Sequence, residues 1–250
     1  MGQPTLTRDR TLLIGSVALL SVAAWVALWL FGTALHHPAH HHLGDSRPVF
    51  GFFMFLFVGG WTVMTLAMML PTSLPIISTF QTIAGPRQDR PLLIGLLMVG
   101  YLAIWALVGF VVYAGGVLLQ QLAIASSWWE THSYVGGALA LFLAGCYQFT
   151  PLKRRCLDKC RSPLSFVLGY WQGRQDRWNA FRLGVHHGLF CVGCCWALML
   201  LMFGVGVSNL GWMLVLGAVM AVEKNVAWGR QLSAPLGALL LASGLTVLVV

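Results

Sequence analysis

All six cysteines of the chain lie between Cys146 and Cys195, in one fifth of the sequence. Two adjacent histidines, His186 and His187, stand just before the last three of these cysteines. Thiolate sulfur and imidazole nitrogen are ligands that transition metals favour. Polar side chains that cluster in an otherwise apolar chain are costly to hold in a bilayer, so we interpret this cluster first as a functional metal site.

A helix over residues 182–203 would place four of these side chains on one face. They are His187, Cys191, Cys194 and Cys195, at positions i, i+4, i+7 and i+8. A single cysteine in such a helix is usually a small apolar core residue. Three cysteines and a histidine on one stripe favour a ligand role instead, and the sequence therefore predicts a metal site here.

Side chains from two other apolar segments that could also bind a metal are predicted to lie at the same depth in the bilayer as His187 and Cys191. Met64 and Met68 are one helical turn apart near the end of one segment, and Cys146 lies about one turn before the end of another. Both segments are expected to run toward the inner leaflet, as far as the level of His187 and Cys191. Core packing explains the methionines alone, but the matched depth makes all three residues candidate ligands.

Cys156 and Cys160 follow in a basic segment, where their i, i+4 spacing would stack both thiols on one helix face. The basic neighbours are Lys153, Arg154, Arg155 and Lys159. We expect these charges to lower the pKa values of the thiols, so that the pair serves as an entry or relay site for a metal. The alternative is a basic loop whose charges only set the membrane topology.

A histidine tract near the first apolar run is a second, looser metal-binding candidate. It consists of His36, His37, His40, His41 and His42. Such a tract binds divalent metals weakly, although an exposed turn without a dedicated role explains it as well. Glu223 and Lys224 are adjacent and cannot face each other on a helix, so we expect them to have different partners. Glu223 is also a candidate for hydrogen bonding to a metal-bound histidine.

The composition shows which elements must position these residues. Hydrophobic residues make up 58% of the 250 residues and charged residues only 9%, which excludes an ordinary soluble domain. We expect one integral membrane domain over residues 1–250. The net charge of +8 comes from basic loops between apolar runs, so we expect a lipid bilayer and no nucleic acid as the partner.

The fold class predicted from these runs is an all-α, polytopic membrane helical bundle with seven transmembrane helices. The predicted spans are residues 11–35, 50–70, 91–119, 133–150, 182–203, 209–222 and 232–250. The first is interpreted as a retained anchor, since it is too long for a cleaved signal peptide. Gly204, Gly206, Ser208 and Asn209 form the expected turn between the fifth and sixth spans.

Basic residues predict the orientation of these spans. A cytoplasmic N-terminus and an outside C-terminus put 14 of the 15 basic residues on the cytoplasmic side, with Arg47 as the exception. The sequence thus predicts a multi-pass protein of the bacterial cytoplasmic (inner) membrane. Residues 72–83 and 163–171 are expected to be short interfacial helices. Ala180, Gly184 and Gly188 provide a small-residue face for close helix packing.

Four sequence blocks resemble a bacterial family of unknown function whose members are described as predicted metal-binding integral membrane proteins. The blocks are WTVMTLAMMLP (61–71), GCYQFTPLKRRCLDKCRSP (145–163), GVHHGLFCVGCCWALMLLMF (184–203) and VEKN (222–225). The resemblance implies metal binding but no established reaction. It points to the same residues as the helical spacing, namely Met64, Met68, Cys146, Cys156, Cys160, His187, Cys191, Cys194 and Cys195.

Copper(I) handling by transport, storage or delivery is the function that these residues favour, because Cys and Met together suit Cu(I); zinc is a possible alternative ion. Partners would be other membrane subunits or a protein that donates or accepts the metal. No phosphate-binding loop that would indicate an ATP-driven pump is present. Two other functions stay open. One is an accessory subunit with a structural or redox metal, or with haem bound by His186 and His187. The other is a membrane thiol oxidoreductase that uses Cys191 and Cys194, and the enzymatic character is therefore undecided.

Overall fold

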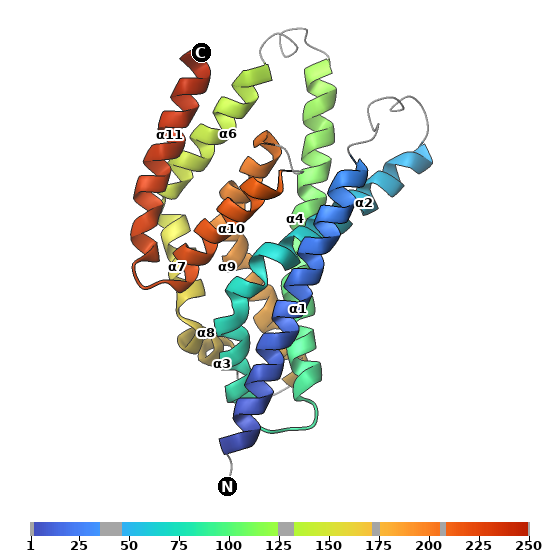
Figure 1. Cartoon of the computed structure of the whole chain (residues 1–250), viewed down its shortest axis with the longest axis vertical. Helices are drawn as coiled ribbons and strands as arrows, with labels where there is room; N and C mark the ends of the chain where they lie inside the picture. The colour runs from blue at the N-terminus through green and yellow to red at the C-terminus, as the bar shows by residue number, and fades with distance from the viewer. Residues whose placement is uncertain (1–2, 36–46, 125–132, 172–175, 206–208, 250) are drawn as a thin grey trace. The chain divides into compact units, whose positions relative to one another are not determined.

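A computed structural model describes residues 3–35, 47–124, 133–171, 176–205 and 209–249 (Figure 1). Over these ranges the elements are all helices, as predicted, and no strand occurs. The histidine tract and part of the expected turn at 204–209 lie outside the described residues. The helices are α1 (Gln3–Leu35), α2 (Arg47–Met69), α3 (Leu74–Ala84), α4 (Arg90–Ile124), α6 (Ser133–Gln148), α7 (Pro151–Arg161), α8 (Pro163–Tyr170), α9 (Asp176–Val205), α10 (Leu210–Asn225) and α11 (Ser233–Val249). Short 3₁₀ turns, η1 (Pro71–Ser73) and η2 (Gly229–Leu232), precede α3 and α11.

Five of the described helices are long and apolar enough to cross a membrane. These stretches are Arg10–Leu30, Gly51–Met69, Arg90–Gln121, Asp176–Met202 and Gly229–Val249. A sixth crossing results if α6 and α7, which meet at a 64° bend, are counted as one broken span. The 16 residues of α10 reach only about 24 Å, which is short of a hydrocarbon core of about 30 Å. The seven-span count and the orientation therefore stay predictions.

The chain forms two compact units, which are described separately below. The first unit comprises residues 1–110 and 162–189, and the second comprises residues 111–161 and 190–250. Both α4 and α9 contribute to both units. The expectation of one membrane domain over the whole chain stays a prediction.

In the first unit, α4 and α9 pack closely through small residues. A Cβ atom on Gly184 would overlap the backbone of Leu97, and a Cβ on Gly188 would lie 2.9 Å from the side chain of Ile104. Ala180, one turn before Gly184, is fully buried. The small-residue face predicted for this helix is thus confirmed, and it explains how two helices can approach without large side chains between them.

Short helices cover the same end of the first unit. The predicted short helix over 72–83 is observed as η1 and α3, and the predicted helix over 163–171 is observed as α8. α3 and α8 lie side by side, and the rings of Phe80 and Trp171 meet edge to face at 5.0 Å. Ser162 is the N-cap residue of α8, but its side chain makes no capping hydrogen bond.

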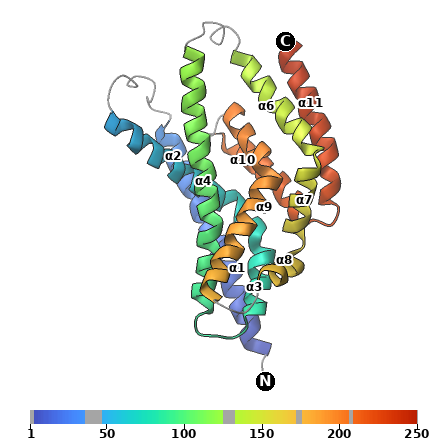
Figure 2. The same cartoon turned by 180° about the vertical axis from the view of Figure 1, so that it is seen from behind.

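In the second unit, α11 lies alongside α6, as both views show (Figure 1, Figure 2). Glycines make the approach possible, since a Cβ on Gly145 would lie 2.8 Å from Leu241, and one on Gly237 would lie 2.6 Å from Phe149. Pro151 begins α7 directly after α6, and a proline cannot continue the preceding hydrogen-bond ladder. The resulting bend carries α7 away from the α6 axis and against α10.

Candidate metal centre

Four buried cysteines of the second unit form one cluster. Cys160 comes from α7, whereas Cys191, Cys194 and Cys195 come from α9. The Cys194 thiol lies within hydrogen-bonding range of the thiols of Cys160, Cys191 and Cys195. The three cysteines of the stripe predicted on α9 therefore lie beside a thiol from a helix that is distant in the sequence.

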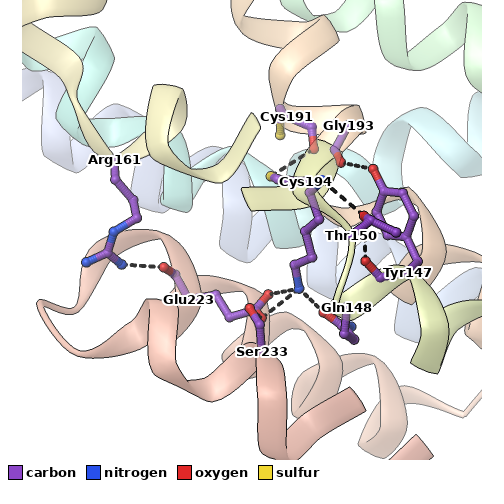
Figure 3. A network of polar contacts seen from close by, with 10 residues as sticks. Tyr147, Gln148, Thr150, Arg161, Cys191, Gly193, Cys194, Glu223 and Ser233 are labelled. Atoms are coloured by element: carbon purple, nitrogen blue, oxygen red, sulfur yellow. Dashed lines mark hydrogen bonds and ion pairs between the residues drawn. The ribbon is translucent and has the colours of Figure 1, made fainter. Parts of the chain in front are cut away.

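The backbone of α9 fixes the orientation of two of these thiols. Cys194 Sγ donates a hydrogen bond to the Cys191 carbonyl oxygen at 3.1 Å (Figure 3). Cys195 Sγ donates to the same oxygen at 2.9 Å. Both bonds follow from the i−3 and i−4 spacing in a helix, where side chains can return to a carbonyl one turn earlier. A thiol donates such a bond only while it carries its proton, so binding of a metal would have to replace these bonds.

A lysine borders the cluster. Lys224 of α10 is buried, with 6% of its surface exposed, and its Nζ donates a hydrogen bond to Cys191 Sγ at 3.1 Å. Lys224 also acts electrostatically on Cys160, Cys194 and Cys195. The cluster thus combines four thiols with one lysine side chain in a buried site.

Cys156 lies one turn before Cys160 on α7 and is also buried, so the shared face predicted for the pair is confirmed. A Cβ on Gly193 would lie only 2.5 Å from Cys156 Sγ, which means that the thiol contacts α9 where that helix has no side chain. The Tyr147 hydroxyl donates a hydrogen bond to the Gly193 carbonyl (Figure 3).

The prediction that neighbouring basic residues lower the thiol pKa values is wrong. Burial, and secondarily the nearby Cys194, raise the pKa of Cys156. A hydrogen bond with Cys194 and burial raise the pKa of Cys160 as well. The reason is that Lys153 is directed to Glu223 and Arg154 to the Phe149 carbonyl, so these charges do not face the thiols.

The described residues contain no set of three or more Cys, His, Asp or Glu side chains arranged to hold a metal ion. The thiol contacts nevertheless provide pairs of sulfur atoms on neighbouring helical turns and on two helices. A soft monovalent ion such as Cu(I) can be bound by two thiolates, whereas an ion that needs four ligands requires a larger rearrangement.

The remaining predicted ligands lie elsewhere. Cys146 is exposed on α6 and stands outside the buried thiol cluster. Met64 and Met68 on α2 and His187 on α9 are buried in the first unit. His187 Nε2 lies 3.0 Å from the Ser73 hydroxyl. A shared ion between these three residues and the cysteines stays a prediction.

The family model of PpoB2, described as a copper chaperone, matches residues 58–247, well over half of the chain. This chain belongs to the PpoB2 copper chaperone family. The match covers the thiol cluster, Lys224 and the predicted ligands from Met64 to Cys195, but not the histidine tract at residues 36–42. No curated protein and no solved structure matches the chain.

Membership in the PpoB2 family supports the expectation, drawn from the Cys and Met residues, that the chain handles copper. The bilayer location and the ligands are not part of what the match establishes. His186, the second histidine, stacks on Tyr170 with ring centroids 4.3 Å apart, whereas His187 stacks on Tyr101 at 5.1 Å. The two histidines thus face different neighbours, because adjacent residues point in different directions around a helix.

Sequence reasoning missed a buried ionic network beside the thiols of this PpoB2 family member. Lys153 Nζ lies 2.7 Å and 2.9 Å from the two carboxylate oxygens of Glu223 and also donates to Gln148 (Figure 3). Ser233 donates to the same carboxylate at 2.7 Å. Glu223 and Lys224 have different partners, as predicted, but the partners of Glu223 named here include no histidine. The sequence signal for this network was Glu223, an acidic residue within an apolar run. Its partner Lys153 is 70 residues away in sequence, so local spacing does not reveal the pair.

Proposed function

We propose that this PpoB2 family member is a multi-pass protein of the bacterial inner membrane that binds Cu(I) through its buried thiols and passes the ion to another protein. The observation that carries the proposal is the meeting of Cys160 on α7 with Cys191 and Cys194 on α9 in one buried cluster. The family match independently indicates copper as the cargo.

The chemistry of the cluster supports Cu(I). Thiolates are soft ligands that suit Cu(I) as well as Zn(II), and a reducing cytoplasm would keep the thiols available. Cys194 contacts thiols on both helices, so an ion can change partners by exchanging one sulfur for another without leaving the cluster. Stepwise exchange is what a chaperone needs, because it must release its cargo as well as bind it.

The thiols on α7 provide a route for that exchange. Cys156 lies one helical turn from Cys160 and contacts α9 at Gly193, so it stands next to the cluster without being part of it. We assign Cys156 the role of a relay ligand between the cluster and a donor or acceptor protein. Met64, Met68 and His187 of the first unit are proposed as further ligands, whereas Cys146 is exposed and is not assigned to the buried site.

Cu(I) titration of the purified, fully reduced chain against a competing chelator tests the proposal. We expect at least one tightly bound Cu(I) per chain, and at least a 100-fold loss of affinity when C191S and C194S are combined. The matched control is C146S, which removes a thiol from the same unit but from an exposed position and should retain the affinity. A wild-type chain that binds no Cu(I), or a double variant that binds as well as wild type, would contradict the proposal.

A further inference from the structure

The second unit contains two buried lysines, and they have different kinds of partner. Lys153, with 1% of its surface exposed, forms an ion pair with the Glu223 carboxylate. Lys224 instead places its Nζ 3.1 Å from Cys191 Sγ. A carboxylate brings its own negative charge, whereas a thiol becomes negative only when it loses its proton, as it does on binding a metal.

The charge of the loaded site depends on the metal. Two thiolates with Cu(I) carry a net charge of −1, and the adjacent Lys224 ammonium brings the total to zero. Two thiolates with Zn(II) are already neutral, and the same ammonium leaves a total of +1. A net charge in a buried, low-dielectric site is unfavourable, so the lysine helps the monovalent ion and opposes the divalent one.

We propose that Lys224 is a specificity-determining residue that makes the thiol cluster prefer Cu(I) over Zn(II) by balancing the charge of a two-thiolate complex. The inference rests on the proposed function and adds to it the reason for the choice of metal. Cys191 and Cys194 are the pair that Lys224 serves, because Lys224 touches the first and acts electrostatically on the second.

The hydrogen bond gives the lysine a second effect in the same direction. An ammonium donor to sulfur stabilises a thiolate more than a thiol, since charge-assisted hydrogen bonds are the stronger kind. Cu(I) gains from both effects, whereas Zn(II) gains from the hydrogen bond and loses from the excess charge. The ratio of the two affinities is therefore the quantity that separates this role from a purely structural one.

Metal titrations of the reduced full-length chain with Cu(I) alone and with Zn(II) alone test this role. We expect K224M to weaken Cu(I) binding by about 10- to 100-fold, as the loss of an adjacent charge in a partly desolvated site predicts. Zn(II) binding should stay the same or tighten. K224R, which keeps the charge, should preserve the ratio of the two affinities to within about threefold.

K159M is the matched control, because Lys159 is an exposed lysine of α7 next in sequence to Cys160, and its loss should change neither affinity. Equal losses for both metals in K224M, or no loss for Cu(I), would overturn the inference while leaving copper binding itself established. Absence of Cu(I) binding in the wild-type chain would instead refute the proposed function. If K224M does not keep its helical content, K224Q compared with K224R makes the same measurement.

Discussion

Two buried clusters of the second unit differ in how their charges are balanced. The ionic cluster comprises Lys153, Glu223, Gln148 and Ser233, and its cation and anion are both supplied by the chain. The thiol cluster comprises Cys160, Cys191, Cys194 and Cys195 with Lys224 beside it, and its thiols become anions only by losing protons. The charges of the first cluster are paired within the chain, whereas in the second cluster the proposed Cu(I) would bind the thiolates.

Adjacent residues connect the two clusters. Glu223 and Lys224 follow each other on α10, so that one helical turn presents an acid to the ionic cluster and a base to the thiol cluster. Arg161 at the end of α7 donates to the Glu223 carbonyl and to the Ala227 carbonyl, which holds α7 against the end of α10. We infer that the ionic cluster fixes the position of α7 and α10, and that this position brings Cys160 and Lys224 to the thiols of α9.

Removal of the acid from the ionic cluster should have the largest effect on stability. E223Q leaves the Lys153 ammonium buried without a carboxylate, and breaking one side of a buried pair costs about 3–5 kcal/mol. Thermal unfolding in detergent measures the loss. The double variant K153M/E223L removes both charges and should recover most of the stability, so a double variant as unstable as E223Q would contradict this account.

The helices of both units could be predicted from the sequence, and so could the stripe of cysteines on α9. Hydrophobic runs and i, i+4 spacing are local properties, which explains why the predicted runs coincide with observed helices. The small-residue face at Ala180, Gly184 and Gly188 was predictable for the same reason.

Contacts between distant segments could not be predicted in this way. The pKa prediction for Cys156 failed because nearness in sequence to Lys153 says nothing about where the lysine points, and Glu223 attracts it. Cys146 was placed by depth alone, but its direction around the axis of α6 leaves it exposed. The depth of a residue along a helix and its direction around the helix axis are independent. For Cys146 the sequence predicted only the depth.

A methyl group at the contact between α7 and α9 should have an intermediate effect. G193A would place a Cβ atom 2.5 Å from Cys156 Sγ, so the thiol or the helix must move. We expect a loss of about 1–3 kcal/mol in unfolding free energy, as is typical of overpacking. The control is G137A on α6, where a Cβ meets nothing within 4 Å and should be neutral or mildly stabilising.

G193A also tests the proposed role of Cys156 as a relay ligand for the thiol cluster. Because Cys156 is proposed as a relay, G193A should slow transfer of Cu(I) from the loaded chain to a chelator more than it weakens equilibrium binding. Stopped-flow transfer measurements at fixed copper loading provide the rate. Unchanged transfer kinetics in a folded G193A variant would remove Cys156 from the proposed route.

The smallest effect is expected from an ion pair outside both clusters. Asp158 of α7 and Arg230 of η2 lie 3.4 Å apart, but their side chains are 47% and 55% exposed, respectively. Exposed pairs contribute about 0–1 kcal/mol, because water and salt screen the charges. D158N should therefore change thermal stability far less than E223Q, although each variant removes one carboxylate that pairs with a basic residue. Equal losses of thermal stability in D158N and E223Q would mean that burial does not determine how much an ion pair stabilises this protein. That result would contradict the contrast between the buried ionic cluster and the exposed pair.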